Sequence, residues 1–467
     1  YEINGQWEDM ALRREEIVVD GRDEPHVFVV RYTRHGIVAS DSMVEDRPFD
    51  YEGDQPQLFA LAYAWTALIP SHSVQAAYNV NKAQNWAEFN EALEDFHAGK
   101  QNWLYADVDG NIGCVMPGRV PVRAAGDGTL PVPGWNDDFN WVGFIPYQEA
   151  PRVYNPEKGF IVTANNPQVR AEDYPYLLRV YHARGQRAER FVEQILADND
   201  GITIEEAMGY QTDNGSLSAR EVIPYLAPLS FEDINLAAAR DMLLGWDAQM
   251  HMDSPEAALF NIFWAQLVTK TFDDQLPPGQ SLGAGTYTSD IIYDLLQDPD
   301  HLWWDDVLAT PISVEGRDDI LRAAFEAAYA EGVETFGDNV SEWRWGDLHT
   351  ITFRNATLGN SGIGFIENIF NRGPYPTSGG EAVPNKTGWS GDDYSVSSIP
   401  ALRQVIDLGD LDNTRMVHSV GQSGHPMDPT YDNFIELWRN LEYHPSNWSR
   451  ETAESGSSNT LILEPKS

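Results

Sequence analysis

A long helical block between two strand-rich ends is the feature that most constrains the fold. Throughout residues 184–340, apolar residues recur at helical spacing, with little alternation of β-branched residues. The segments on either side instead contain short runs rich in valine, isoleucine and phenylalanine, which are typical of strands. We therefore predict an α+β fold in three parts: a β-rich part at 1–183, the helical block at 184–340, and strands with one helix at 341–467.

Three local patterns in the first part predict single elements. The segment from His26 to Tyr32 is typical of a strand. Apolar residues recur at helical spacing after Asn85, a residue type that caps helix N-termini. The Asp109-Gly110 pair between two apolar runs predicts a hairpin turn rather than a calcium loop, which would need glycine at its sixth position and glutamate at its twelfth.

Charge and composition exclude several classes of protein. Asp and Glu number 72 against 31 Lys and Arg, a net charge of −41, which opposes binding to nucleic acid. The acid excess and the scarcity of lysine fit either a high-salt habitat, where charge repulsion is screened, or an acidic secreted protein. No apolar run is long enough for a membrane span. The single cysteine, Cys114, permits no intramolecular disulfide and no cysteine-built metal site.

Common catalytic and cofactor motifs are missing from the sequence. It contains no His-Glu-x-x-His pair, no phosphate-binding Gly-x-x-x-x-Gly-Lys and no Gly-x-Gly-x-x-Gly. Ser361 and Ser423 lack the spacing of a nucleophile elbow and are interpreted as turn residues. We therefore expect no required cofactor and no nucleotide chemistry.

Asn165 is the strongest candidate that the residues themselves offer. The apolar segment from Gly159 to Thr163 is expected to form a buried strand that leads to Asn165-Asn166-Pro167. Asn165 either caps the end of this strand or donates from its amide to the oxyanion that develops in acyl transfer. The residue pattern alone leaves both readings open.

Several short segments, in order along the chain, resemble the penicillin acylase family of N-terminal-nucleophile amidohydrolases. They are Asn102 to Gly113, Leu130 to Gly134, Val153 to Pro156, Thr163 to Pro167, Asp173 to Pro175, Trp343 to His349, and Gly421 to His425. The resemblance spans essentially the whole chain and covers most of the family's large subunit. It implies a four-layer αββα sandwich with a largely helical insertion.

The resemblance also implies roles for particular residues. Asn165 matches the family's oxyanion-hole asparagine, and Arg187 matches the arginine that orients this asparagine and the surroundings of the nucleophile. Without the resemblance, Arg187 would be read as one exposed cation in an arginine-rich helix. Gln101 falls where some relatives line the acyl pocket with an aliphatic residue, so it either lines that pocket or faces solvent.

Two departures from the family pattern affect the nucleophile and the metal. Family members attack with an N-terminal serine that this chain does not contain, so the chain alone is expected to be inactive without a preceding segment or a small subunit of the same precursor. The backbone carbonyl of Gly128 matches one ligand of the family's structural calcium, but Tyr181 stands where relatives usually carry an aspartate ligand. Calcium is thus only partly supported.

The expected activity is the cleavage of a secondary amide in a small N-acyl compound, such as a β-lactam or an acyl-homoserine lactone. The acyl-enzyme would form on the missing serine. The alternative is a non-catalytic paralogue that keeps the fold as a binding or structural protein. By resemblance, we expect a periplasmic or secreted protein of antibiotic-related acylase type.

Overall fold

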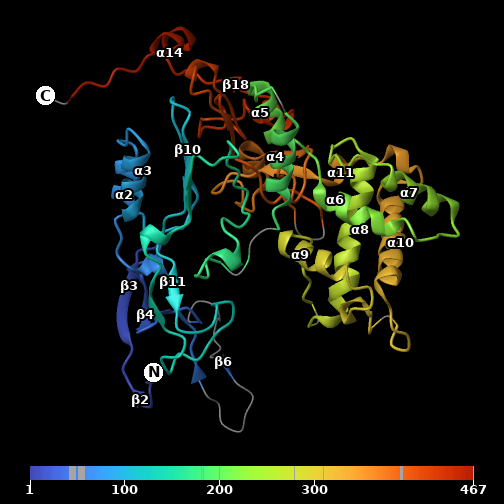
Figure 1. Cartoon of the computed structure of the whole chain (residues 1–467), viewed down its shortest axis with the longest axis horizontal. Helices are drawn as coiled ribbons and strands as arrows, with labels where there is room; N and C mark the ends of the chain where they lie inside the picture. Colours follow the sequence, from blue (N-terminus) through green and yellow to red (C-terminus); the bar gives the residue numbers. More distant parts are fainter. Residues whose placement is uncertain are drawn as a thin grey trace. The chain divides into compact units, whose positions relative to one another are not determined.

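The chain forms an α+β structure that divides into two compact units (Figure 1). The computed structural model describes residues 1–40, 49–50, 58–179, 181, 184–198, 200–277, 279–308, 310–389 and 393–465. Unit 1 comprises residues 1–163 and 167–182, and unit 2 comprises residues 164–166 and 183–467. The three residues 164–166 therefore belong to unit 2 although the chain on both sides of them belongs to unit 1.

Unit 1 is built mainly from antiparallel strands. A four-stranded sheet has the order β3-β4-β5-β8, a three-stranded sheet has the order β13-β10-β9, and the remaining strands form pairs. Two helices, α2 (Ser73–Val80) and α3 (Trp86–Ala92), belong to the same unit. The strands are β1 (Glu2–Ile3), β2 (Gln6–Trp7), β3 (Ala11–Ile17), β4 (His26–Thr33), β5 (Gly36–Val38), β6 (Phe49–Asp50), β7 (Leu58–Phe59), β8 (Ala62–Tyr63), β9 (Trp103–Ala106), β10 (Ile112–Val115), β11 (Pro121–Arg123), β12 (Trp141–Phe144) and β13 (Arg152–Tyr154).

The predicted strand, the predicted helix and the predicted hairpin turn of this unit are all confirmed. The predicted strand is β4, and helix α3 begins after Asn85, whose side chain accepts a hydrogen bond from the N–H of Glu88. In the β9–β10 hairpin, Asp107 Oδ1 accepts from the backbone N–H groups of Asp109 and Asn111, both at 3.0 Å. The carboxylate therefore serves the turn, as expected for a hairpin rather than a calcium loop.

The prediction of a buried strand from Gly159 to Thr163 is wrong. These residues form a loop of partly or fully exposed side chains without ladder pairing to any described strand. A strand requires a neighbour that receives its backbone hydrogen bonds, and an apolar run alone does not supply one. Asn165 consequently follows a loop and not the end of a strand.

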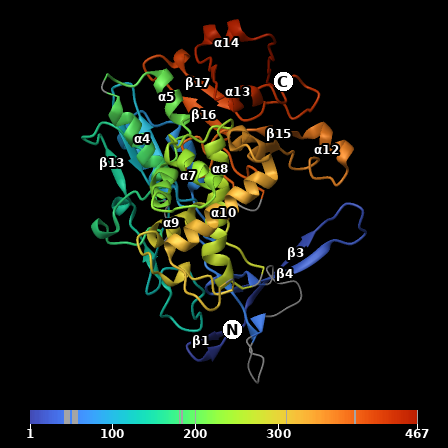
Figure 2. The same cartoon turned by 90° about the vertical axis from the view of Figure 1, so that its right-hand side faces the viewer.

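Unit 2 has a helical core with small sheets nearby (Figure 2). Its helices are α4 (Gln186–Ala197), α5 (Ile204–Gln211), α6 (Leu217–Val222), α7 (Ile234–Leu244), α8 (Pro255–Phe272), α9 (Thr286–Leu295), α10 (Arg317–Phe336), α11 (Trp345–Leu348), α12 (Gly364–Phe370), α13 (Ile435–Arg439) and α14 (Arg450–Gly456). Its strands are β14 (Thr350–Phe353), paired with β15 (Arg372–Pro376), and β16 (Leu402–Val405), β17 (Arg415–His418) and β18 (His444–Pro445), which form one sheet.

Helix α8 is the centre of this core. Ser254 caps its N-terminus by accepting from the N–H of Ala257, and Pro255 occupies the first turn, where its missing N–H costs nothing. Every residue from Ala257 to Trp264 is buried, so neighbours pack against the helix on all sides. Such all-round burial is typical of a central helix without a polar face. None of the helices in the described part of the chain is both long and apolar enough to span a bilayer.

Candidate active site

Asn165 lies in a short loop that the structure assigns to unit 2. Its backbone adopts a left-handed conformation with φ of +66°, which asparagine tolerates better than most residues that carry a side chain. The preceding Ala164 is buried, and its N–H donates to Oδ1 of Asn166 over 2.9 Å. The loop thus fixes the backbone of Asn165 while its side chain stays exposed.

Arg187 holds this loop from the first turn of helix α4. Its Nη2 donates to the carbonyl oxygen of Ala164 over 3.1 Å and to Oδ1 of Asn165 over 2.5 Å. Helix α4 begins after Gly185, which has a φ of +98° that only glycine adopts without strain. This turn places Arg187 at the helix end that faces the loop, so the structure brings the two sequence-predicted residues together.

The neighbouring arginines of the same run are engaged differently. Arg190 binds both carboxylate oxygens of Asp213, at 2.6 and 3.1 Å. Arg184 lies 3.4 Å from Glu221 and 3.6 Å from an aspartate of helix α9. Arg187, by contrast, forms no ion pair within 4.0 Å in the part of the chain that the structure describes, and it is half-buried. The reading of Arg187 as an ordinary exposed helix cation therefore does not fit its surroundings.

The electrostatic environment of Arg187 is unfavourable for a purely structural cation. Burial lowers the pKa of its guanidinium, and nearby Glu381 partly offsets this effect. In addition, a positive charge in the first turn of a helix opposes the helix dipole, whose N-terminal end is positive. The stabilising contacts of Arg187 are its hydrogen bonds to the loop at Asn165, which makes loop positioning its clearest role.

The contact with Arg187 also fixes which way the amide of Asn165 points. A guanidinium has only N–H donors, so the atom that it binds must be the acceptor oxygen of the amide. The Nδ2 group therefore points away from Arg187, and it donates to no other residue among those described. An exposed amide donor held by a charged partner is a suitable geometry for binding an anionic oxygen.

The other predicted site residues belong to unit 1. Gln101 is exposed and lies just before β9, and Tyr181 is 47% exposed. Gly128 has a φ of +85° and lies against the guanidinium of Arg123. None of the three takes part in the contact between Asn165 and Arg187.

The calcium site stays a prediction of the resemblance. A hard cation such as calcium needs several oxygen ligands, and the described residues contain no group of three or more His, Cys, Asp or Glu side chains arranged to hold a metal. The guanidinium of Arg123, which packs against Gly128, would repel a cation bound to this carbonyl. The residues present fit calcium poorly, so no chemical step is assigned to a metal.

Sequence reasoning missed two residues of the site. Asn166 fixes the loop through Ala164, although the pattern singled out only its neighbour. Glu381 acts on Arg187 across 194 sequence positions, and it is also paired with Lys386 at 3.4 Å. The two consecutive asparagines at 165 and 166 could have indicated Asn166. No spacing in the sequence indicates Glu381.

A model of the penicillin amidase family matches residues 1–455 of the chain. The acyl-homoserine lactone acylase QuiP of Pseudomonas fluorescens is 28% identical over 475 residues, which cover 96% of this chain and 55% of that protein. A penicillin acylase 2 proenzyme of a Pseudomonas species is also 28% identical, over 98% of this chain and 57% of its own length. The chain thus spans about half the length of these curated relatives.

The fold has a close counterpart among solved structures. A thermostable penicillin G acylase from Alcaligenes faecalis superimposes with a TM-score of 0.68 at 21% identity, covering 100% of this chain and 84% of the other. At this identity the likeness concerns the fold alone. Together with the mixed helices and strands of this chain, it confirms the predicted α+β fold class.

Proposed function

Because the chain belongs to the penicillin amidase family, we propose that it forms the larger part of an amidohydrolase that cleaves a secondary amide. The observation that carries this proposal is the contact of Arg187 Nη2 with Asn165 Oδ1 at 2.5 Å. It leaves the amide Nδ2 group oriented and available as a donor. The names of the relatives, which describe acylases, support the same reaction class.

Asn165 acts on the oxygen of the scissile carbonyl. When a nucleophilic oxygen attacks the carbonyl carbon, the π electrons move to the carbonyl oxygen, and the Nδ2–H group of Asn165 donates to the resulting oxyanion. Collapse of this intermediate breaks the C–N bond, and the amine leaves with a proton. Water then attacks the acyl-enzyme and releases the carboxylic acid, with Asn165 donating to the second oxyanion.

Arg187 acts through Asn165 and is a positioning residue. It holds Oδ1 of the amide and the carbonyl oxygen of Ala164, so neither the side chain nor the loop has to reorganise when charge develops. Donors that are already aimed at the developing charge stabilise the transition state more than donors that must first turn.

By the family resemblance, the nucleophile is an N-terminal serine whose own α-amino group serves as the base. None of the 467 residues corresponds to it, so we assign this serine to another segment of the same precursor. The acyl-homoserine lactone and penicillin acylases among the relatives indicate the substrate class, a small N-acyl compound that yields a carboxylic acid and an amine. By the same resemblance, we expect a periplasmic or secreted location.

The test compares this chain alone with a longer polypeptide that includes the segment preceding it. Both are incubated with acyl-homoserine lactones of several chain lengths and with penicillin G, and acid release is measured against a boiled control. The longer protein should process itself and hydrolyse at least one substrate, whereas the chain alone should hydrolyse none. A longer protein that folds but hydrolyses nothing would favour the non-catalytic paralogue, and turnover by the chain alone would exclude an external nucleophile.

A further inference from the structure

Five asparagines each begin an Asn-x-Ser/Thr sequence, or sequon, in which the middle residue is not proline. They are Asn214, Asn339, Asn355, Asn385 and Asn447, and all five belong to unit 2. A sequon is the acceptor sequence for N-linked sugars in exported proteins. Because a pattern this short also arises by chance, the accessibility of each amide decides which of them a sugar can modify.

Two of the five amides are closed off inside the protein. Asn214 is 2% exposed and Asn385 is 0% exposed. Nδ2 of Asn385 donates to Oδ1 of Asn214 over 2.9 Å, and Nη2 of Arg403 donates to Oδ1 of Asn385 over 2.8 Å. A sugar on either amide would break this buried network and leave polar groups without partners, at a cost in stability. The folded protein therefore excludes a sugar at both positions.

Asn339 lies in the turn that follows helix α10. The helix ends at Gly337, whose φ of +94° favours glycine. The hydroxyl of Ser341 donates to Oδ1 of Asn339 over 2.8 Å, and both residues are exposed. Trp343, which is 0% exposed, anchors the end of the turn in the core. The acceptor amide and the hydroxyl that defines the sequon therefore lie side by side at the surface.

The nitrogen of this amide has a hydrogen to give up. A side-chain amide carries two N–H donors, and Nδ2 of Asn339 donates to Oε1 of Glu342 over 2.8 Å. Attachment of a sugar removes only one of the two N–H groups. The other can continue to donate to Glu342, so the turn keeps this contact after modification.

The two remaining sequons are tied into the local fold. Asn355 is half-buried, and its Oδ1 accepts from the backbone N–H of Thr357 over 3.1 Å. Asn447 is exposed, but the hydroxyl of Ser449 caps helix α14 by accepting a backbone N–H of that helix over 3.2 Å. At Asn339, by contrast, the hydroxyl donates to the asparagine of its own sequon. Asn339 is therefore the best acceptor of the five.

From this geometry we propose that Asn339 is a site of N-linked glycosylation, with a sugar carried on a polyisoprenyl phosphate or pyrophosphate as the donor. Nδ2 attacks the anomeric carbon of the sugar and forms the new N–C bond. The bond from this carbon to the phosphate oxygen breaks, and its electron pair passes to the phosphate. One proton of Nδ2 passes to a basic group of the modifying enzyme. The proposal rests on the expected export of the protein and not on its amidase activity.

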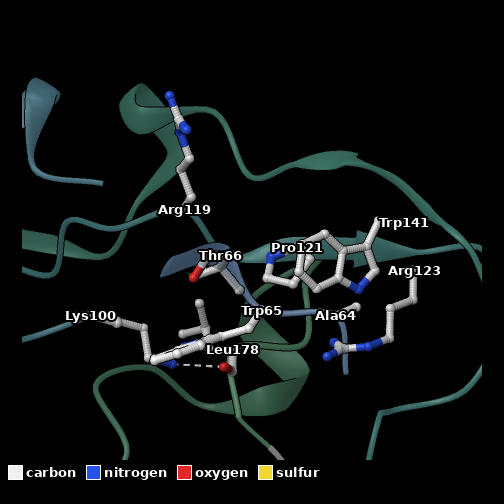
Figure 3. Close-up of a pocket in the computed structure, with 10 residues that line it drawn as sticks. Ala64, Trp65, Thr66, Lys100, Arg119, Pro121, Arg123, Trp141 and Leu178 are labelled. Atoms are coloured by element: carbon white, nitrogen blue, oxygen red, sulfur yellow. Dashed lines mark hydrogen bonds between the residues drawn. The ribbon is translucent and has the colours of Figure 1, made fainter. Parts of the chain in front are cut away.

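The cavity of unit 1 lies outside this modification. It has a volume of about 250 Å³, and none of the ten residues that line it is an asparagine (Figure 3). All of these residues belong to unit 1, whereas all five sequons belong to unit 2. The sugar therefore changes the surface of unit 2 and leaves the lining of the cavity chemically as it is.

The experiment determines the mass of the complete protein recovered from outside the cytoplasm of the organism that encodes it. The same protein made in a bacterial cytoplasm, where it meets no lipid-linked sugar, supplies the unmodified mass. Fragmentation of the peptides that contain the five sequons locates any sugar. Asn339→Gln and Ser341→Ala each destroy the sequon, whereas Ser341→Thr preserves it. Asn360→Gln is the matched control, since Asn360 is an exposed asparagine outside any sequon.

The exported protein should be heavier than the cytoplasmic one by whole sugar residues, with the highest occupancy on Asn339 and none on Asn214 or Asn385. Asn339→Gln and Ser341→Ala should lose the sugar of this peptide completely. Ser341→Thr and Asn360→Gln should retain it. The melting temperature shows whether each variant is folded, and if one is not, the peptides of the parent protein decide the question.

Three results would overturn the proposal. One is an unmodified Asn339 in the protein recovered from outside the cytoplasm. Another is a sugar on Asn214 or Asn385 in the folded protein, which would show that burial does not select the acceptor. The third is a sugar that stays on Asn339 in the folded Ser341→Ala variant, since the modification would then not depend on the sequon.

Discussion

Nη2 of Arg187 lies 2.5 Å from Oδ1 of Asn165, although 22 positions separate the two residues in the sequence. This contact joins the first turn of helix α4 to a loop whose flanking chain belongs to the other unit. It makes Arg187 responsible for the orientation of the amide.

Replacing Arg187 should lower turnover without comparable loss of stability. In the complete, processed enzyme, Arg187→Met removes both hydrogen bonds to the loop, so the Asn165 amide can turn away from its productive orientation. We expect kcat to fall by up to about 100-fold with little change in KM. The control is Arg184→Met, which removes partly exposed ion pairs and a cation–π contact with Tyr293 but no contact with the loop at Asn165. Equal kcat values for the two variants would contradict the positioning role.

Asp290 should make the stability of unit 2 depend on pH. Burial raises the pKa of its carboxyl to about 6, an effect opposed by Arg184 and increased by Asp294 and Glu221, and its Oδ1 has no hydrogen-bond partner among the described residues. Since the folded pKa exceeds the unfolded value of 3.8, this group lowers the stability progressively as the pH rises from about 4 to about 6, and the loss is complete above pH 6.

Asp290→Asn should therefore raise the melting temperature by about 1–3 °C at pH 7.5 and change it little near pH 4. Thermal unfolding of parent and variant at both pH values checks this expectation. A gain of the same size at pH 4 would show that ionisation of Asp290 is not the cause.

Two helical glycines should respond oppositely to alanine. Gly332 in α10 packs against Trp343, and an added Cβ would lie 2.1 Å from the indole ring, so Gly332→Ala should destabilise the protein by about 1–3 kcal/mol. Gly209 in α5 has open space around the same position, so Gly209→Ala should stabilise it by about 0.5–1 kcal/mol. Denaturant unfolding of both variants measures the difference, and a stabilised Gly332→Ala variant would refute the packing argument.

The net charge of −41 predicts a dependence on salt. Screening reduces the repulsion among carboxylates, so the melting temperature should rise between about 0.1 M and 2 M KCl. The measurement is thermal unfolding over this range, with sucrose at matched viscosity as a control. A melting temperature that stays constant or falls with salt would contradict adaptation to high salt and would favour the alternative of an ordinary acidic protein.

The sequence predicted elements that short-range chemistry controls. The cap at Asn85 and the turn at Asp109-Gly110 each involve residues no more than four positions apart. The neighbouring sequence is therefore enough to predict them. The failed strand at Gly159 to Thr163 shows the limit, because pairing depends on a partner elsewhere in the molecule.

The candidate site could be predicted only through the family resemblance. Nothing in the local pattern links Asn165 to Arg187, since their contact arises from the fold of a loop onto a helix end. No sequence pattern indicates the effect of Glu381 on Arg187, because the two residues are far apart in the chain. No pattern indicates the packing of Arg123 on Gly128 either, because this contact depends on the conformation of the backbone. The three-part division at 184 and 341 and the calcium ligand stay predictions.

Asn155 offers a matched control for the central residue. Like Asn165 it is an exposed asparagine with positive φ, at +47°, but its side chain accepts from the N–H of Ile112 and donates to Asn111. It is a structural cap by these contacts. Asn155→Ala should therefore cost about 1 kcal/mol of stability and leave turnover unchanged.

The most direct test of the account is kcat for Asn165→Ala in the complete, processed enzyme, measured together with KM and the melting temperature. We predict that kcat falls by about 10²- to 10³-fold, equivalent to about 2.7–4 kcal/mol of transition-state stabilisation, while KM changes little and the melting temperature falls no more than in Asn155→Ala. A near-normal kcat with a lowered melting temperature would make Asn165 a structural cap and would contradict its role at the oxyanion.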